Sequence, residues 1–168
     1  MKYFLLFSLF LATLLSSCNR GVFVTIDSKQ YDYGKNTEVT LQYVSGKPPG
    51  YMLDIKTFKR SVNDSSFFLL GVSQANEHIT TGNYSFPNTD RTNLPTSTIT
   101  FYNKNGVQYM SGGDEVYGTT FIITSLNKKR AKGWFKSKLG DIKEDTATLN
   151  NSINVNGRFN VSLKNAKK

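Results

Sequence analysis

The chain has 168 residues, a length that suits a single domain. Lys and Arg outnumber Asp and Glu by 21 to 12, and the sequence holds one cysteine and one histidine. A lone cysteine excludes an internal disulfide and argues against a zinc site built from several thiolates. The spread positive charge is compatible with acidic glycans, anionic lipid or nucleic acid as partners, although a lysine-rich soluble surface is sufficient to explain it.

The first 17 residues have the pattern of a secretory signal peptide. Lys2 supplies a positive charge, residues 3–15 form a nearly unbroken apolar run, and Ser16 and Ser17 are small. The apolar run is shorter than the roughly 20 residues that a transmembrane helix needs. We therefore expect a signal-peptide helix over residues 1–17 that is removed from the mature protein.

The segment Leu15-Ser16-Ser17-Cys18 resembles the lipobox of bacterial lipoproteins, which places an aliphatic residue and two small residues before an obligatory cysteine. The resemblance implies that the Cys18 thiol receives a diacylglycerol and that cleavage follows before Cys18. More than one acyl chain, such as palmitate, makes the membrane attachment persistent. In lipoprotein families an Asp after this cysteine can retain the protein at the inner membrane. Asn19 therefore implies the outer membrane, and the absence of an acidic run in residues 19–21 favours its periplasmic side.

After Cys18 the sequence shows short runs in which apolar and polar residues alternate, separated by Gly, Asn, Asp, Ser and Pro. This pattern is typical of strands and turns. The predicted strands are residues 22–26, 31–33, 38–43, 51–58, 67–73, 84–86, 98–102, 107–110, 118–125, 131–139 and 153–163.

Several features of this pattern predict how the strands pair. Residues 31–33 are expected to pair with the first strand after a turn near Asp27, and residues 67–73, apolar on both faces, suit a central strand. Asn105-Gly106 indicates a hairpin with a two-residue turn, and residues 127–130 a second hairpin.

The last strand shows the clearest alternation. Its predicted core face contains Ile153, Val155, Phe159, Val161 and Leu163, and its predicted water face contains Asn154, Asn156, Arg158, Asn160 and Ser162. Gly157 interrupts the core face and suggests a bulge or bend.

Together these strands predict an all-β domain over residues 22–163. An antiparallel β-sandwich is the expected architecture, and a lipocalin-like β-barrel is the alternative. Residues 18–21 form the lipidated tether, and residues 164–168 a disordered tail.

The chain also resembles a family of small Bacteroidota lipoproteins with a β-sheet domain of unknown function. The opening segment, residues 24–29, is similar to the first strand and turn of that family. Further matching residues are Gly82, Tyr84, Phe86, Gly118, Ile122, Ile123, Thr124, Gly133, Phe135, Gly157 and Phe159. The resemblance covers about residues 22–163 and implies a β-sheet domain on a lipid tether. It carries over no functional residue.

One strand face offers a candidate binding surface. Lys132, Trp134, Lys136 and Lys138 share one face of the strand at residues 131–139, while the opposite face is apolar. An indole flanked by ammonium groups can stack on a sugar ring or hold an anionic glycan. In the alternative interpretation, which the sequence favours, Trp134 covers a second apolar layer and the lysines extend to solvent.

No pattern in the sequence predicts catalysis. His78 is expected in an exposed loop, since no nucleophile motif accompanies it. The carboxylates at residues 114–115 and 141–145 are expected in solvated loops rather than in a glycosidase cleft or calcium site. Residues 145–147 resemble a Bacteroidota O-glycosylation acceptor, with Thr146 as the modified residue.

The sequence therefore predicts a lipid-anchored, non-catalytic cell-envelope module with no cofactor or metal. Its expected partner is a glycan or another envelope protein, and nucleic acid is not expected because an exported protein seldom meets it. The alternatives are a lipocalin-like carrier of a small apolar ligand and a hydrolase that uses scattered carboxylates.

Overall fold

The computed structural model describes residues 20–34, 36–45, 49–59, 64–86, 96–112, 116–141 and 151–163. The predicted signal peptide, Cys18 and the tail at residues 164–168 lie outside these ranges. The described residues form an all-β, antiparallel structure, as the sequence predicts. Its strands are β1 (Gly21–Ile26), β2 (Lys29–Gly34), β3 (Thr37–Val44), β4 (Gly50–Phe58), β5 (Phe67–Ala75), β6 (Gly82–Asn83), β7 (Thr96–Tyr102), β8 (Gln108–Met110), β9 (Thr119–Asn127), β10 (Arg130–Asp141) and β11 (Ser152–Ser162).

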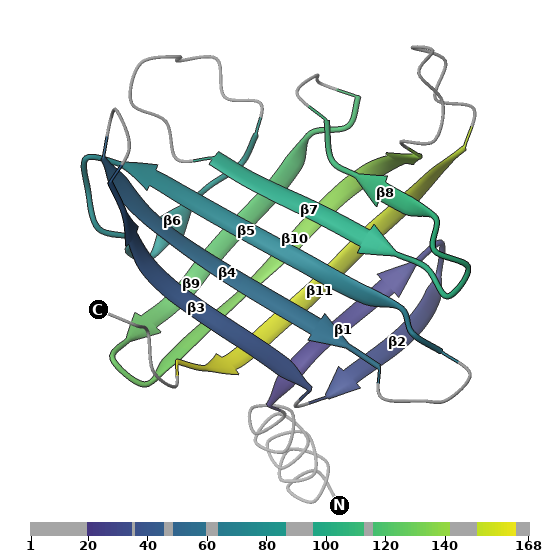
Figure 1. Ribbon diagram of the computed structural model, residues 1–168, viewed down its shortest axis with the longest axis horizontal. Coiled ribbons are helices and arrows are strands. Elements are labelled where there is room, and N and C mark those ends of the chain that lie inside the picture. Colours follow the sequence, from purple (N-terminus) through teal and green to yellow (C-terminus); the bar gives the residue numbers. More distant parts are fainter. Residues whose placement is uncertain are drawn as a thin grey trace, which may run out of the picture.

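The strands belong to one curled sheet in the order β2-β1-β11-β10-β8-β7-β5-β4-β3, with β9 beside β10 and β6 beside β9. Strand β10 joins the two halves of this sheet. Its residues Arg130 to Ser137 pair with β9, whereas Gly140 and Asp141 pair with β8. We call β2, β1, β11, β10, β9 and β6 the first half, and β8, β7, β5, β4 and β3 the second half. Figure 1 shows the second half in front of the first, with the strand directions crossing.

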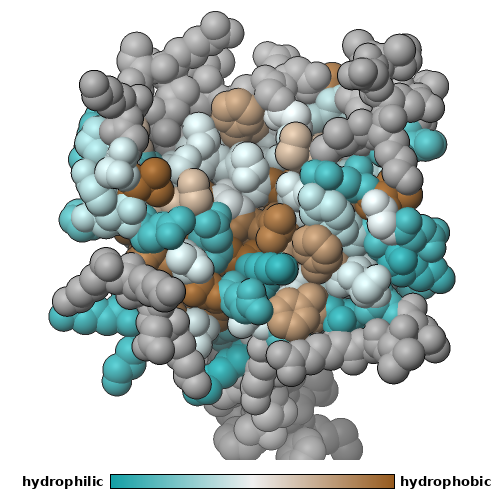
Figure 2. Space-filling model, in the orientation of Figure 1, coloured by the Kyte–Doolittle hydropathy of each residue, from teal (hydrophilic) through white to brown (hydrophobic). Residues whose placement is uncertain are grey.

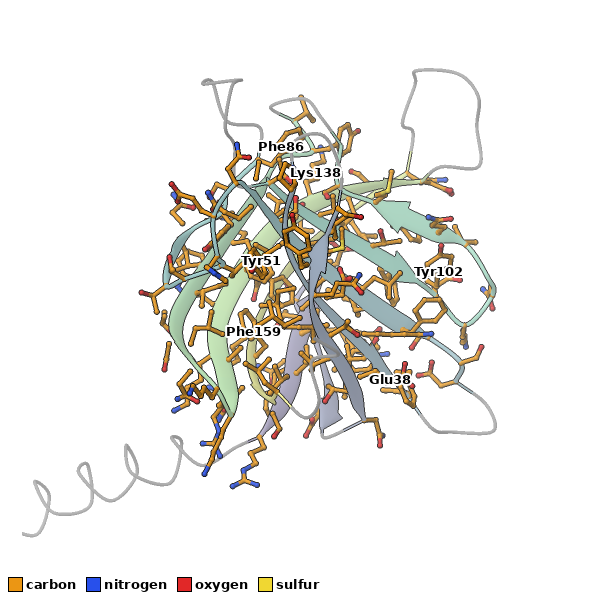
Figure 3. The ribbon with its side chains drawn as sticks, turned by 60° about the vertical axis from the view of Figure 1, so that its left-hand side comes forward. Glu38, Tyr51, Phe86, Tyr102, Lys138 and Phe159 are labelled. Atoms are coloured by element: carbon orange, nitrogen blue, oxygen red, sulfur yellow. The ribbon has the colours of Figure 1, made fainter. Side chains whose placement is uncertain are left out.

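The core lies between these halves because alternate side chains of each strand point inward. From the first half it receives Val24, Phe121, Phe135 and Phe159, and from the second half Leu53, Phe68, Leu70 and Ile99, each no more than 2% exposed. The halves touch where the ring of Tyr33 meets that of Phe68, with 5.5 Å between centroids. In Figure 3 side chains, Phe159 among them, fill the space between the layers.

Two glycines on the inner face allow the rings of neighbouring strands to lie flat. Gly133 is opposite Phe159, and Phe135 is opposite Gly157, in the pairing of β10 with β11. A Cβ on Gly133 would lie 2.5 Å from the Phe159 ring and would overlap the Ile122 carbonyl oxygen. A Cβ on Gly157 would lie 2.5 Å from the Phe135 ring. The two Phe rings therefore occupy the volume that side chains would take at the glycines.

The bulge that the sequence suggests at Gly157 is not present. The register of β11 runs unbroken through this residue on both sides, against Phe135 and against Val24. The glycine interrupts the apolar pattern because Phe135 covers it, which sequence alternation cannot show.

The predicted hairpins are largely confirmed. Asp27 and Ser28, with φ of 42° and 72°, form the two-residue turn between β1 and β2. Strands β7 and β8 also form a hairpin, but Tyr102 pairs with Gln108, so the connection is longer than the predicted two residues. The Asn103 side chain explains this length, since its Oδ1 accepts hydrogen bonds from backbone N–H groups inside the loop.

Two further expectations concern β5 and the segment near Tyr84. Strand β5 lies between β4 and β7, which confirms the central strand. Of the short strand predicted at residues 84–86, the structure retains one bridge between Phe86 and Thr119, and regular pairing occurs earlier, at Gly82 and Asn83.

The Tyr33 hydroxyl is buried between the halves, 3.4 Å from the Ser66 hydroxyl. Burial raises the pKa of Tyr33 to about 12, because the phenolate would lose its hydration.

Replacing Gly133 with alanine is expected to destabilise the fold by about 3 kcal/mol, because the new methyl group displaces both backbone and the Phe159 ring. Gly106→Ala is the control, since nothing lies within 4 Å of a Cβ there and the cost of its φ of +76° is about 1 kcal/mol. Urea unfolding followed by circular dichroism measures both changes. Equal midpoints for the two variants would contradict the packing described for Gly133.

Stability is expected to fall as the pH rises from about 10 to about 12. In this interval an unfolded tyrosine has lost its proton while folded Tyr33 keeps it, so the folded state binds more protons and a rise in pH favours unfolding. Denaturant unfolding at several pH values, compared between the wild type and Tyr33→Phe, measures the effect. The variant is expected to show a shallower decline, and an identical decline would contradict the burial of this hydroxyl.

Candidate ligand-binding groove

The outer face of the first half brings together side chains from strands far apart in the sequence. Trp134 of β10 is opposite Arg158 of β11, Arg158 is opposite Phe23 of β1, and Phe23 is opposite Asp32 of β2. Because inward residues alternate with outward ones, these four side chains form one row across four strands. The row begins with an indole, continues with a guanidinium and a phenyl ring, and ends with a carboxylate.

This row borders an open groove of about 520 Å³, and Gln30 and Lys136 also line it. The Trp134 side chain is 44% exposed. The Arg158 guanidinium carbon lies 5.0 Å from the centroid of the Phe23 ring, a cation–π arrangement that holds the cation between the two aromatic residues.

The predicted binding residues share this face, but the structure gives them different surroundings. Lys136 lines the groove with Trp134, whereas Lys132 and Lys138 lie on either side of it along β10. The Lys138 ammonium is 5.6 Å from the centre of the Tyr117 ring. The exposure of Trp134 and its position at a groove favour the binding interpretation over the one in which this residue covers a second apolar layer.

The carboxylate of the groove is held in place by the backbone. The Gly34 N–H donates a 2.6 Å hydrogen bond to Asp32 Oδ1. Arg158 and Lys136 also line the groove, so its lining residues carry more positive than negative charge. The groove can therefore stack an apolar ring face and bind an anion at the same time, and Asp32 retains an oxygen that can accept a hydroxyl hydrogen bond.

A second surface lies on the outer face of the second half, which faces the viewer in Figure 2 and mixes apolar with polar side chains. Two shallow depressions there, of about 140 and 200 Å³, share Met52, Ser73 and Thr96. The Ser73 and Thr96 hydroxyls are 2.5 Å apart. Burial raises the pKa of Asp54, which borders the smaller depression. This surface is smaller and lacks a cation among its lining residues.

The remaining candidates lie elsewhere. His78 is exposed, as expected, and its ring centre is 4.1 Å from that of Tyr51. Asp141 ends β10, far along the strand from the groove. Residues 114–115 and 142–150, which include the other predicted carboxylates and Thr146, lie outside the described residues.

Within the described ranges, no group of three or more His, Cys, Asp and Glu side chains is placed to hold a metal ion. The same part of the chain has no helix with the length and apolar character that a bilayer crossing requires.

The sequence did not predict three members of the row, Phe23, Arg158 and Asp32, as binding residues. Alternation did place Arg158 on the water face of its strand, but its neighbours depend on the pairing of β1 with β11. That pairing joins distant segments of the chain, such as Gly21 with Asn160 and Ile26 with Val155, and no local signal encodes it.

Comparisons with protein-family models, with curated proteins and with solved structures found no match for this chain.

Proposed function

We propose that this chain is a lipid-anchored cell-envelope protein, a non-catalytic binding module whose outer sheet face binds an acidic saccharide. The observation that carries the proposal is the exposed indole of Trp134 in one row with Arg158 and Phe23, beside a groove of about 520 Å³.

The row suits a sugar because it combines two kinds of contact. An indole presents a flat apolar surface on which the C–H face of a pyranose ring can stack, and its size makes the contact area large. A guanidinium binds a carboxylate, sulfate or phosphate group through paired hydrogen bonds. An acidic sugar offers both features within one unit, so it matches the groove better than a neutral sugar or a purely apolar ligand.

The spacing of the row favours a chain of sugars over a single one. Trp134 and Phe23 are two strands apart, which corresponds to about 10 Å at the usual distance between strands. The groove is open rather than enclosed, and an open site can accept a polymer that enters and leaves on both sides. Arg158, between the two rings, would then face an acidic group between stacked units.

The composition of the groove supports binding without chemistry. Hydrolysis of a glycosidic bond uses two carboxyl groups on opposite sides of the bond. The lining residues of this groove include one carboxylate, Asp32, and its Oδ1 is already bonded to the Gly34 N–H.

For the architecture we favour a β-sandwich over a lipocalin-like barrel. The core side chains of the two halves meet directly, as Tyr33 and Phe68 do, and Phe68 stacks on Phe101 with 4.5 Å between centroids. Phe121 and Phe159 fill the other side, 5.3 Å apart. A carrier of apolar ligands needs an interior volume that its own side chains leave open.

The lipid anchor is supported by the motif that ends at Cys18 and by the nearby start of the domain. Strand β1 begins at Gly21, three residues after Cys18. Two or more acyl chains on the thiol would make the attachment persistent. As in the sequence-based expectation, the periplasmic side of the outer membrane is the favoured location.

Trp134→Ala is expected to weaken the binding of acidic polysaccharide about tenfold, equivalent to about 1.4 kcal/mol, because the stacking surface is removed. The probes are polygalacturonate, heparin and neutral dextran, measured by isothermal titration calorimetry at low and moderate salt. Acidic probes are expected to bind better than dextran and to lose affinity as salt increases.

Tyr43→Ala is the matched control for this loss, since Tyr43 is an exposed aromatic residue of β3 on the other half of the sheet, with 58% exposure. Its affinity for the probes is expected to equal that of the wild type, and circular dichroism verifies that both variants fold. Equal affinity of Trp134→Ala and Tyr43→Ala would refute the groove as the binding site.

Cys18→Ser is expected to remove the lipid and to prevent processing at the lipobox. Mass spectrometry of the N-terminal peptide is expected to find acyl groups on Cys18 in the wild type and none in the variant. An unmodified Cys18 in the wild type would refute the lipid anchor, whatever the result for the groove.

A further inference from the structure

Three segments of the first half meet at one end of its strands. Gly21, at the start of β1, is opposite Asn160 of β11, which is opposite Lys132 of β10. The Leu163 N–H, just past β11, donates a 2.9 Å hydrogen bond to the Lys129 carbonyl oxygen in the β9–β10 turn. In Figure 1 the start of β1, the end of β11 and the β9–β10 turn all lie toward the lower side. We call this end of the strands the tether end, because β1 begins here and Cys18 precedes β1 in the sequence.

The tether end is strongly basic. Residues 20–25, 125–132 and 158–163 contain no Asp or Glu. They contain the cationic residues Arg20, Lys128, Lys129, Arg130 and Lys132, and also Arg158, which is level with Trp134 and Asp32 in the groove row. Arg20, Lys128 and Lys129 are exposed. On the first half, the carboxylate closest to this end in strand register is Asp32, opposite Phe23 in β2.

The opposite end of the same strands carries two carboxylates, with Lys29 of β2 beside one of them. It carries Asp27 in the β1–β2 turn and Asp141 at the end of β10. Both are close enough to Tyr109 to raise the pKa of its hydroxyl, although burial contributes more. Arg130 and Asp141 are the two ends of one strand, so they are roughly 35 Å apart at the usual rise per residue. This distance is several Debye lengths at physiological salt, so the two carboxylates do not reduce the attraction of the basic end for an anionic surface.

The length of the tether restricts where the basic end can lie. Between Cys18 and Gly21 the backbone can span about 10 Å when fully extended. A lipid on Cys18 would therefore hold the start of β1 within about one Debye length of the lipid headgroups. At this distance each Lys or Arg is attracted to an anionic membrane surface.

From this placement we propose that the tether end is a membrane-docking surface for anionic phospholipid headgroups, which it contacts through Lys128, Lys129 and Arg20. The inference rests on the proposed lipid anchor at Cys18. It adds a defined orientation, in which the tether ends of β1, β10 and β11 contact the membrane. The ends near Asp27 and Asp141 then point away from it.

Docking in this way leaves the groove accessible. Trp134 is four residues along β10 from Arg130, which corresponds to roughly 13 Å above the contact at the usual rise per residue. The groove then opens sideways, parallel to the membrane, because it lies on the face of the sheet rather than at its end. A single anchored chain can thus hold a headgroup surface and a saccharide with different residues.

The experiment uses the lipidated, full-length mature protein reconstituted in two kinds of vesicle. One kind contains phosphatidylglycerol and phosphatidylethanolamine in equal parts, and the other contains phosphatidylcholine alone. A membrane-impermeant acetylating reagent labels exposed lysines, and peptide mass spectrometry measures the rate at each site. Lys128 and Lys129 are expected to react roughly tenfold more slowly in the anionic vesicles. Lys104, in the β7–β8 turn, is expected to react equally in both.

Charge reversal extends the test without affecting the core. Lys132, two residues along β10 from Arg130, is expected to be protected in anionic vesicles together with Lys128 and Lys129, and to lose this protection in Lys128→Glu combined with Lys129→Glu. The matched control Lys104→Glu is expected to keep it. Equal labelling of Lys128 and Lys129 in the two kinds of vesicle, on a chain whose N-terminal peptide is acylated, would overturn the docking surface and leave the anchor intact. An N-terminal peptide without acyl groups would overturn the anchor and the docking surface together.

Discussion

The packing of a phenylalanine against a glycine in each of two cross-strand pairs, between β10 and β11, is the constraint on which the rest of the first half depends. Phe159 lies over Gly133, and Phe135 lies over Gly157, so each strand supplies both a ring and the space for one. Such reciprocal packing fixes the register, since a shift of either strand by one residue would turn that strand's ring to the water face. It also keeps the inner face flat enough for Phe121 to complete the core.

The same register determines the outer face. When Phe135 and Phe159 point inward, Trp134 and Arg158 must point outward, and the pairing of the two strands places them opposite each other. Strand β1 adds Phe23 by the same rule, because Val22 and Val24 fill the core on its other side. The groove is therefore a consequence of core packing, and the requirements of folding and of binding are met by alternate residues of the same strands.

This dependence explains what could be predicted from the sequence. Alternation within β10 and β11 identified the inner and outer faces correctly, including Trp134 and the lysines beside it, because period two is a local property. The groove could not be predicted, since Phe23 reaches Arg158 through a pairing between opposite ends of the chain. The role of Gly157 could not be predicted for the same reason. A glycine is needed there because the Phe135 ring of another strand occupies the space that a side chain would take. The Asn103 side chain likewise lengthened a turn that Asn105-Gly106 alone predicted to be short.

The distribution of charge along the strands connects the fold with its proposed location. A net charge spread over a sequence is weak support for a partner, because lysines also serve solubility. The sheet changes this by bringing Lys128, Lys129 and Arg20 to one end and Asp27 and Asp141 to the other, although the sequence positions of the two sets are interleaved. Antiparallel pairing causes this arrangement. Because neighbouring strands run in opposite directions, residues that are far apart in the sequence lie at the same end of the sheet. In an anchored protein, this polarity brings the basic end to an anionic surface and places Asp27 and Asp141 beyond the range of its electrostatic potential.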